Sequence, residues 1–203
     1  LLRGQASVGP RSLATTEKAA RPPCMLTKTR RFELRERTAA THAELDRLVG
    51  GFDTIGDYSR YLTGIHAFRA AVEPCFEENP AICWRPEPLR HLIEADMADL
   101  GIGRTPAIGV ALQPRSISEA LGIAYVLEGS RLGAKLLFRR AISLGFGAEH
   151  GARHLSVQSR GADCWKSYIA ALEAAEPFDP DAAVAAASAT FGLALDAFRR
   201  AAR

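Results

Sequence analysis

The sequence has little of what marks a membrane-spanning or secreted protein. No apolar run approaches the ~20 residues that span a bilayer, and no secretory hydrophobic segment is present. The 4 cysteines have no CxxC spacing and no dense pattern, which excludes a disulfide framework and suits a reducing compartment. Cys75 and Cys83 share a proline-rich loop in which they can approach each other, but we do not expect a bridge between them. We therefore expect a cytoplasmic protein that does not bind a membrane.

The chain also carries no net positive charge after its first 31 residues. The formal net charge is +3, but the first 31 residues contain five Arg and two Lys against one Glu, which leaves about −3 on the remainder. A nucleic-acid footprint needs a basic stripe on the folded part, and the sequence shows none. We expect no nucleic-acid partner.

Residues 1–30 lack apolar periodicity and are rich in small, polar and basic residues, which is typical of disorder. The scarcity of acidic residues also fits a transit peptide, whereas Met25 is a candidate internal start and favours upstream sequence. Hydrophobic residues make up 47% of the chain, which is enough for residues 31–203 to bury one substantial core. We predict a disordered N-terminal extension followed by a single domain.

Helical periodicity dominates this domain, and no segment alternates as a strand does. Thr54, Ser116 and Asp179 are candidate N-caps, and clusters of Gly and Pro separate the periodic segments. The predicted helices cover about residues 30–49, 54–74, 89–100, 116–145 and 164–172, and a last helix begins at 179. The predicted loops are 74–88, 101–114 and 147–161. The fold class is therefore all-α.

Two glycines, Gly129 and Gly133, lie near the middle of the long helix predicted at 116–145. Each costs about 1 kcal/mol relative to alanine in a helix interior. Residues four apart share a face, so the pair leaves a strip of backbone without side chains. Either another helix or a flat ligand can lie against such a strip, and the glycines alone favour helix packing.

Histidines offer two further candidate sites. His42 lies on the apolar stripe of the first predicted helix, where a histidine is a core or boundary residue more often than a ligand. His150 and His154 have the i, i+4 spacing of a zinc pair, but Gly151 lies between them and no carboxylate is placed as in HExxH. His66 and His91 fall off the main apolar stripes, so we expect both to be solvated.

Three blocks of sequence in a fixed order resemble one family. They are LRERTAATHAELDRLV, which contains His42, then YVLEGSRLGA, which contains both glycines, and EHGARHL, which is followed by Trp165. Over about residues 32–198 the chain resembles the haem oxygenases, in particular the bacterial branch that makes biliverdin. The resemblance implies an all-α fold that holds haem between a proximal helix and a kinked distal helix.

The resemblance also implies roles for individual residues. His42 matches the proximal iron ligand of the family, and Gly129 and Gly133 match glycines of the distal helix, where missing side chains leave room for dioxygen. Animal members have an aspartate in the distal stretch, and this sequence has none. Proton delivery is then expected from water held by groups such as Ser130, with Arg153 as a further candidate.

Propionate anchors can be assigned in the same way. Arg35 precedes His42 by seven residues, about 10.5 Å along the same helix face, which is about the reach from an iron to a ring edge. A guanidinium can pair with a carboxylate there, and the family has a basic residue at this position. Tyr125 lies one turn before Gly129, and a matching tyrosine in bacterial members contacts a propionate.

The expected activity is oxidative cleavage of haem to biliverdin, carbon monoxide and ferrous iron, with haem as both substrate and cofactor and dioxygen as the oxidant. Electrons must come from an external reductase or ferredoxin, because the sequence has no flavin or nucleotide motif. A bilin-accepting protein is a further candidate partner. Two alternatives stay open: a haem carrier or sensor on the same fold, and a non-haem iron oxidase or thiamin-related hydrolase of similar helical architecture.

Overall fold

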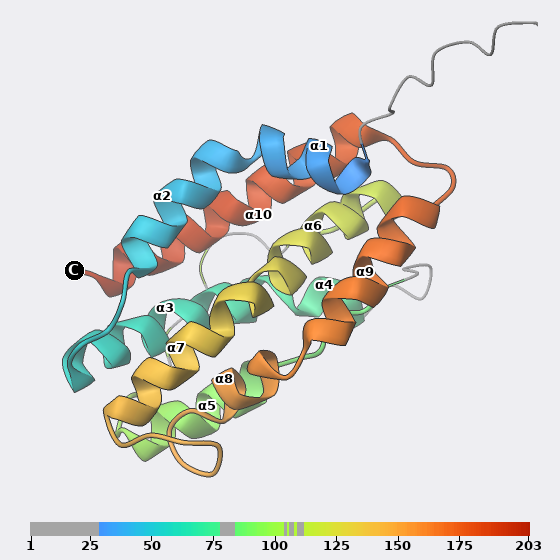
Figure 1. Cartoon of the computed structure of the whole chain (residues 1–203). Coiled ribbons are helices and arrows are strands. Elements are labelled where there is room, and N and C mark those ends of the chain that lie inside the picture. The colour runs from blue at the N-terminus through green and yellow to red at the C-terminus, as the bar shows by residue number, and fades with distance from the viewer. Residues whose placement is uncertain (1–28, 78–83, 104, 106–107, 109–111) are drawn as a thin grey trace, which may run out of the picture.

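The computed structural model describes residues 29–77, 84–103, 105, 108 and 112–203, and these contain ten helices and no strand. Residues 1–28 of the extension predicted to be disordered lie outside these ranges, as does Cys83, whereas Cys75 is described and is a free cysteine. The all-α prediction is confirmed (Figure 1). The helices are α1 (Arg30–Arg37), α2 (Ala39–Val49), α3 (Ile55–Val72), α4 (Pro74–Glu77), α5 (Arg90–Asp99), α6 (Ile117–Gly129), α7 (Arg131–Ser143), α8 (Arg153–Ser159), α9 (Ala162–Ala174) and α10 (Pro180–Ala201).

The three predicted N-caps are confirmed. Thr54 and Asp57 form a reciprocal capping box at the start of α3. The Ser116 hydroxyl accepts a hydrogen bond from the Glu119 backbone N–H at 3.1 Å. The Asp179 carboxylate accepts from two backbone N–H groups at the start of α10, where Pro180 occupies the first turn.

Two helices that the sequence predicted as continuous are each interrupted at a hydroxyl residue. The segment 30–49 breaks at Thr38, whose hydroxyl donates to the Leu34 carbonyl at 2.7 Å. The segment 116–145 breaks at Ser130, whose hydroxyl donates to the Leu127 carbonyl at 2.6 Å. Such local bonds compete with the helical backbone and bend it. The second break is the hinge between α6 and α7.

Two predicted loops contain helices. The short helix α4 lies within 74–88, and α8 lies within 147–161, so both loop predictions were wrong there. The start of α8 is held by a distant residue: the buried carboxylate of Asp96 on α5 accepts from the backbone N–H groups of Arg153 and His154 at 3.0 and 3.1 Å. This carboxylate satisfies two of the donors that a helix N-terminus leaves free.

The core is organised around α10, which packs against α6, α3 and α2 (Figure 1). α10 is long and apolar enough to cross a membrane by composition, but half of its most apolar window is buried inside the protein. Close packing with α6 depends on Gly122, where an added Cβ would lie 2.1 Å from the Ala183 carbonyl oxygen. Gly64 of α3 similarly accommodates the ring of Phe198. These contacts fix the scaffold on which α2 and the α6–α7 hinge face each other.

Candidate functional site

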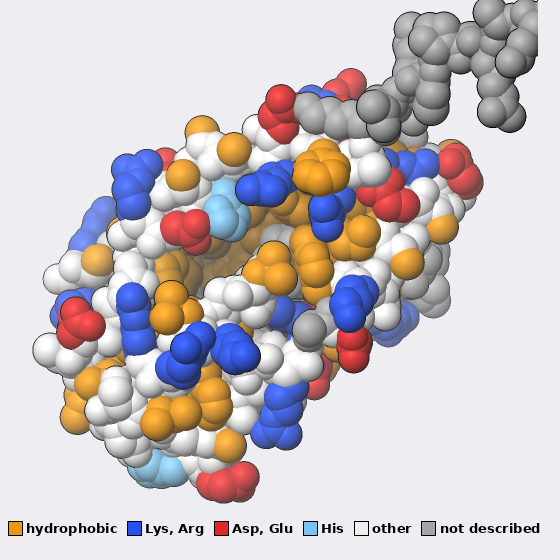
Figure 2. Space-filling view, viewed as in Figure 1, with side chains coloured by type: hydrophobic (Ala, Val, Ile, Leu, Met, Phe, Trp, Pro, Cys, Tyr) orange, Lys and Arg blue, Asp and Glu red, His pale blue; other side chains and the backbone are white. Residues whose placement is uncertain are grey.

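A cavity of about 990 Å³ lies between α1–α2 on one side and α6–α7 on the other, with α3 and α10 contributing its apolar floor. Figure 2 shows the hollow, with hydrophobic side chains inside it and Lys and Arg side chains around its mouth. Among the residues predicted from the sequence, the structure brings His42, Arg35, Tyr125, Gly129, Ser130 and Gly133 to this cavity.

His42 lies on the cavity wall formed by α2. Its side chain is 54% exposed, and its ring meets Phe191 of α10 edge-on at 5.6 Å between centroids. The Nδ1 atom lies 3.0 Å from Oδ2 of Asp46, one turn further along the helix. This contact occupies Nδ1, so Nε2 is the nitrogen available to a metal. This exposure excludes a core role for His42, whereas a boundary position stays compatible with it.

The two glycines face open space across the cavity from α2. A Cβ added at Gly133 would meet no atom within 4 Å, and one at Gly129 would only touch the edge of Trp165 at 4.0 Å. The helix-packing interpretation of this pair is therefore wrong. Gly122 is the glycine of this segment that a neighbouring helix requires.

Ser130 lies between the two glycines and lines the same cavity, yet its hydroxyl is engaged within the protein. It donates to the Leu127 carbonyl and accepts from Nε2 of Gln158 at 3.0 Å and from Nη2 of Arg69 at 3.5 Å. One donor and two lone pairs are all that a hydroxyl offers. Ser130 therefore ties the hinge to α3 and α8, and Gln158, which also lines the cavity, is the polar side chain that reaches it from α8.

A pair of arginines stands at one end of the cavity. Arg31 and Arg35 are one turn apart on α1, and both line the cavity, as does Tyr125 of α6. Burial raises the pKa of Tyr125, and the nearby positive charge of Arg35 partly opposes that shift. A neutral phenol beside a guanidinium can together hold a carboxylate. At the other end Arg140 of α7 lies against Gly51, at the turn between α2 and α3.

Arg153 does not line the cavity. Its guanidinium contacts the carboxylates of Asp96 and Asp99, and these contacts raise its pKa. Its backbone N–H is bonded to Asp96 as well. Arg153 therefore anchors the start of α8 to α5, on the side of α8 that faces away from the cavity.

The two histidines of the HGARH segment bind different partners. His150 is exposed and pairs with Asp99 at 3.2 Å, whereas His154 is fully buried, with Nδ1 at 2.7 Å from Asp96 and Nε2 at 3.3 Å from the Tyr61 hydroxyl. No cluster of three or more metal-binding side chains occurs in the part of the chain that the structure describes. This gives no support for zinc, nor for the carboxylate-rich site that a non-haem iron oxidase requires.

His66 corrects another expectation. It is buried, not solvated. Its ring nitrogens have protein partners there: Nδ1 lies 2.9 Å from the Thr105 hydroxyl and Nε2 lies 3.5 Å from Glu94. His91 is exposed, as predicted. Both histidines lie outside the cavity lining.

Comparison with known proteins decides the family. Heme oxygenase PigA of Pseudomonas aeruginosa is 31% identical over 175 residues, which cover 80% of this chain and 84% of PigA. The chain belongs to the haem oxygenase family. A crystal structure of the NO- and CO-bound heme oxygenase from Neisseria meningitidis superposes with a TM-score of 0.66 at 28% identity, covering 85% of this chain and 92% of the neisserial one. No family model matches the chain.

Sequence reasoning missed several residues of this haem oxygenase site. Arg31 and Asp46 each lie one turn from a predicted residue, so helical spacing alone would have found them. Gln158 falls in a segment predicted as a loop, and no sequence signal marked it. Arg140 lies about three turns beyond Gly129 along the kinked helix, and its approach to Gly51 depends on the tertiary fold.

Proposed function

We propose that this haem oxygenase binds haem in the central cavity and cleaves it to biliverdin, carbon monoxide and ferrous iron. The observation that supports this most is the pairing of His42 on one wall with a bare stretch of helix, Gly129 and Gly133, on the other. A flat ring with a small gas molecule on its distal side requires such an asymmetric space.

The chemistry of the cavity fits haem. Its volume lies at the upper end of the ~300–1,000 Å³ usual for ligand pockets. The walls are mainly apolar, with Ile65, Phe68 and Phe191 among them, which suits a macrocycle. The cations at the rim suit two carboxylates (Figure 2). Haem, when bound, supplies the iron that activates dioxygen and the ring that is oxidised.

On the proximal side, His42 is the iron ligand of this proposal. Its Nδ1 is held by Asp46, which fixes the imidazole's orientation and makes Nε2 a stronger donor. The aromatic ring of Phe191 packs nearly perpendicular to the imidazole of His42. Arg35, Arg31 and Tyr125 anchor the two propionates, which leave the same edge of the ring.

On the distal side, Gly129 and Gly133 leave room for dioxygen and for the bend of its reduced forms. Ser130 holds the hinge in position. Among the described residues, Ser130 is the one hydrogen-bond partner of the Gln158 amide, so Gln158 is a better candidate than Arg153 to hold water that delivers protons. The chain itself supplies no nucleophile in this scheme; it orients the ring and provides hydrogen bonds.

Partners follow from the reaction's needs. An external reductase or ferredoxin supplies the electrons, and a bilin-binding protein is a candidate acceptor of the product. The absence of a disulfide framework favours the cytoplasm, where such donors are found.

The decisive experiment is spectroscopic. One equivalent of haemin should give a complex whose Soret band decays when an electron donor, air and catalase are present, while a bilin band grows in the red. A Soret band that stays constant with a competent donor would identify a haem carrier or sensor instead.

A further inference from the structure

Arg69 of α3 is a cation buried directly behind the distal wall of the cavity. Its side chain is only 2% exposed, and it is the largest of the fully buried side chains among the described residues. Burial lowers the pKa of this guanidinium, and the neighbouring carboxylate of Glu73 opposes the shift. An arginine stays protonated even so, so a full positive charge lies inside the protein.

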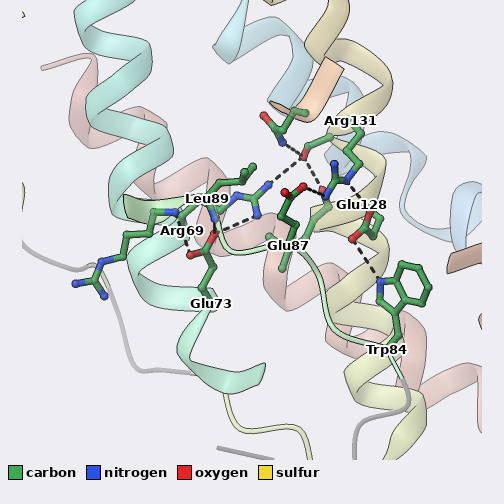
Figure 3. Close-up of polar contacts among 11 residues, drawn as sticks. Arg69, Glu73, Trp84, Glu87, Leu89, Glu128 and Arg131 are labelled. Atoms are coloured by element: carbon green, nitrogen blue, oxygen red, sulfur yellow. Dashed lines mark hydrogen bonds and ion pairs between the residues drawn. The ribbon is translucent and has the colours of Figure 1, made fainter. Parts of the chain in front are cut away.

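This charge has few direct partners. Among the described residues, the one carboxylate bonded to Arg69 is Glu73, through a single contact of 3.2 Å to Nη1, and the negative charge of Glu128 acts on it without a direct bond. Glu73 also accepts hydrogen bonds from the backbone N–H groups of Leu89 and Arg90 at 2.9 and 3.2 Å. Its two oxygens are therefore shared among three donors (Figure 3). The Nε atom of Arg69 has no hydrogen-bond partner among the described residues. A buried donor left unpaired in this way is unusual and calls for an explanation.

Arg131, a second buried arginine at the same hinge, shows the contrast. Its Nε lies 2.8 Å from Glu128 and its Nη2 lies 3.0 Å from Glu87, so two carboxylates balance its charge (Figure 3). The Trp84 indole donates to the other oxygen of Glu128 at 3.3 Å. Arg131 therefore has the arrangement of a structural ion pair, and Arg69 does not.

The remaining contact of Arg69 points toward the cavity. Its Nη2 reaches the hydroxyl of Ser130, which lines the cavity between the two open glycines. A Cβ added at Gly133 would meet open space, so a ligand at this wall would lie close to Ser130 and within the field of the guanidinium. Preorganised positive potential is most effective where negative charge develops in a water-poor site.

We propose that Arg69 provides the positive potential that stabilises negative charge on dioxygen as it is reduced at the distal wall. Arg69 does not touch the cavity and acts through Ser130 and its own field, so it is a positioning residue. The proposal rests on the proposed function, since it assigns the distal side to the α6–α7 hinge.

Carbon monoxide is a suitable probe because its stretching frequency on ferrous haem falls as the potential near its oxygen becomes more positive. Arg69→Met should raise this frequency, leave haem affinity within about threefold, and slow bilin formation roughly tenfold or more at saturating electron donor. Arg69→Lys keeps the positive charge, so its CO stretching frequency should lie much closer to the wild-type value than that of Arg69→Met. Glu73→Gln removes the counter-charge and should shift the frequency in the opposite direction, downward.

The double variant Arg131→Met/Glu87→Gln is the matched control, because it removes a buried hinge cation together with one of its two carboxylates and leaves the net charge of the hinge unchanged. It should reduce stability and leave the frequency close to that of the wild type. If Arg69→Met does not fold, the downward shift in Glu73→Gln still tests the charge. Unchanged frequencies in both variants would overturn the role of Arg69 alone. A wild-type protein that binds haem without degrading it would instead overturn the proposed function.

Discussion

The Nδ1 atom of His42 lies 3.0 Å from the Oδ2 atom of Asp46, one turn further along α2. The pair joins the candidate iron ligand to a carboxylate on the same helix, so no other element is needed to orient the imidazole. Because Asp46 is 68% exposed, solvent screens this interaction and tempers its effect.

Asp46→Asn should therefore weaken the proximal ligand modestly. Removal of the anionic partner makes the imidazole a poorer donor to ferric iron, so the haem reduction potential should rise and ferric haem affinity should fall a few-fold, below the ~10–100-fold typical of sheltered partners. Spectroelectrochemistry and haemin titration measure the two effects. Glu44→Gln, on the same helix but paired with Arg199, is the control and should change neither. A potential that stays constant in Asp46→Asn would show that the contact does not tune His42.

The glycines of α6 and α7 allow one substitution to be compared at two sites. Gly133→Ala should raise apo stability by up to about 1 kcal/mol, because the new Cβ meets no atom and the helix penalty of glycine is removed. Gly122→Ala should lower it by roughly 1–3 kcal/mol, because its Cβ would collide with the Ala183 carbonyl. Urea denaturation of the apo proteins measures both. Equal losses at the two positions would contradict the open wall at Gly133.

A larger side chain at the open position tests the chemistry. Gly133→Leu should leave the apo protein folded and the haem ligated through His42, but it should block bilin formation by filling the distal space. His42→Ala should instead change the ferric haem spectrum, because the proximal nitrogen is lost. A fully active Gly133→Leu enzyme, or a wild-type spectrum in His42→Ala, would remove that residue from the site.

Arg35→Ala should weaken haem binding and alter the ratio of bilin isomers. A charge-assisted contact is worth about 1.5–3 kcal/mol when sheltered and less when exposed, so we expect a roughly three- to tenfold loss of affinity. The matched control is Arg37→Ala on the same helix, since Arg37 pairs with Glu33 and Asp181 away from the cavity. Identical affinities and isomer ratios in the two variants would leave Arg35 as a solvated charge.

Stability should depend on pH through His154. Burial lowers the pKa of this histidine, and its bond to Asp96 only partly opposes the shift. The unfolded chain therefore binds a proton below the ordinary histidine pKa of about 6.5 while the folded protein does not, so stability is fully present above about pH 6.5 and falls as the pH drops below it. His154→Gln should flatten the dependence of unfolding free energy on pH between about 7 and 5. The exposed His91→Gln is the control, and an equally steep profile in His154→Gln would assign the dependence to other groups.

The parts of the fold that sequence predicted well are those decided locally. The caps at Thr54, Ser116 and Asp179 and the apolar stripe around His42 need only neighbours within one or two turns. The breaks at Thr38 and Ser130 were missed because a hydroxyl inside an apolar periodic segment can either point outward or bond to the preceding turn. The family resemblance, not the periodicity, implied a kink near Ser130.

The rest depended on partners far along the chain. α8 was missed because its N-terminus is satisfied by Asp96, 57 and 58 residues earlier. His66 was expected to be solvated because it falls off the main apolar stripe, and its partner Thr105, 39 residues away, could not be found from spacing. Spacing could not tell that Gly122 lies against a helix and Gly133 does not, since both follow the same helical repeat. Arg69, behind the cavity, and Gln158, in its lining, could be placed only from the tertiary arrangement of α3, α8 and the hinge.

Because α2 is separated from the hinge by the cavity, substrate and product would differ in how well they fill the gap between them. α2 rests chiefly on α10, and the glycines Gly50 and Gly51 link it to α3, while the cavity separates it from the hinge on the opposite side. A rigid disc bonded to His42 and packed against the hinge would complete the hydrophobic core and add its binding energy to the fold. A ring-opened, flexible tetrapyrrole fills that gap less well and has no bond to His42. The enzyme would thus lose part of its own interior with each turnover, and the next haem would restore it.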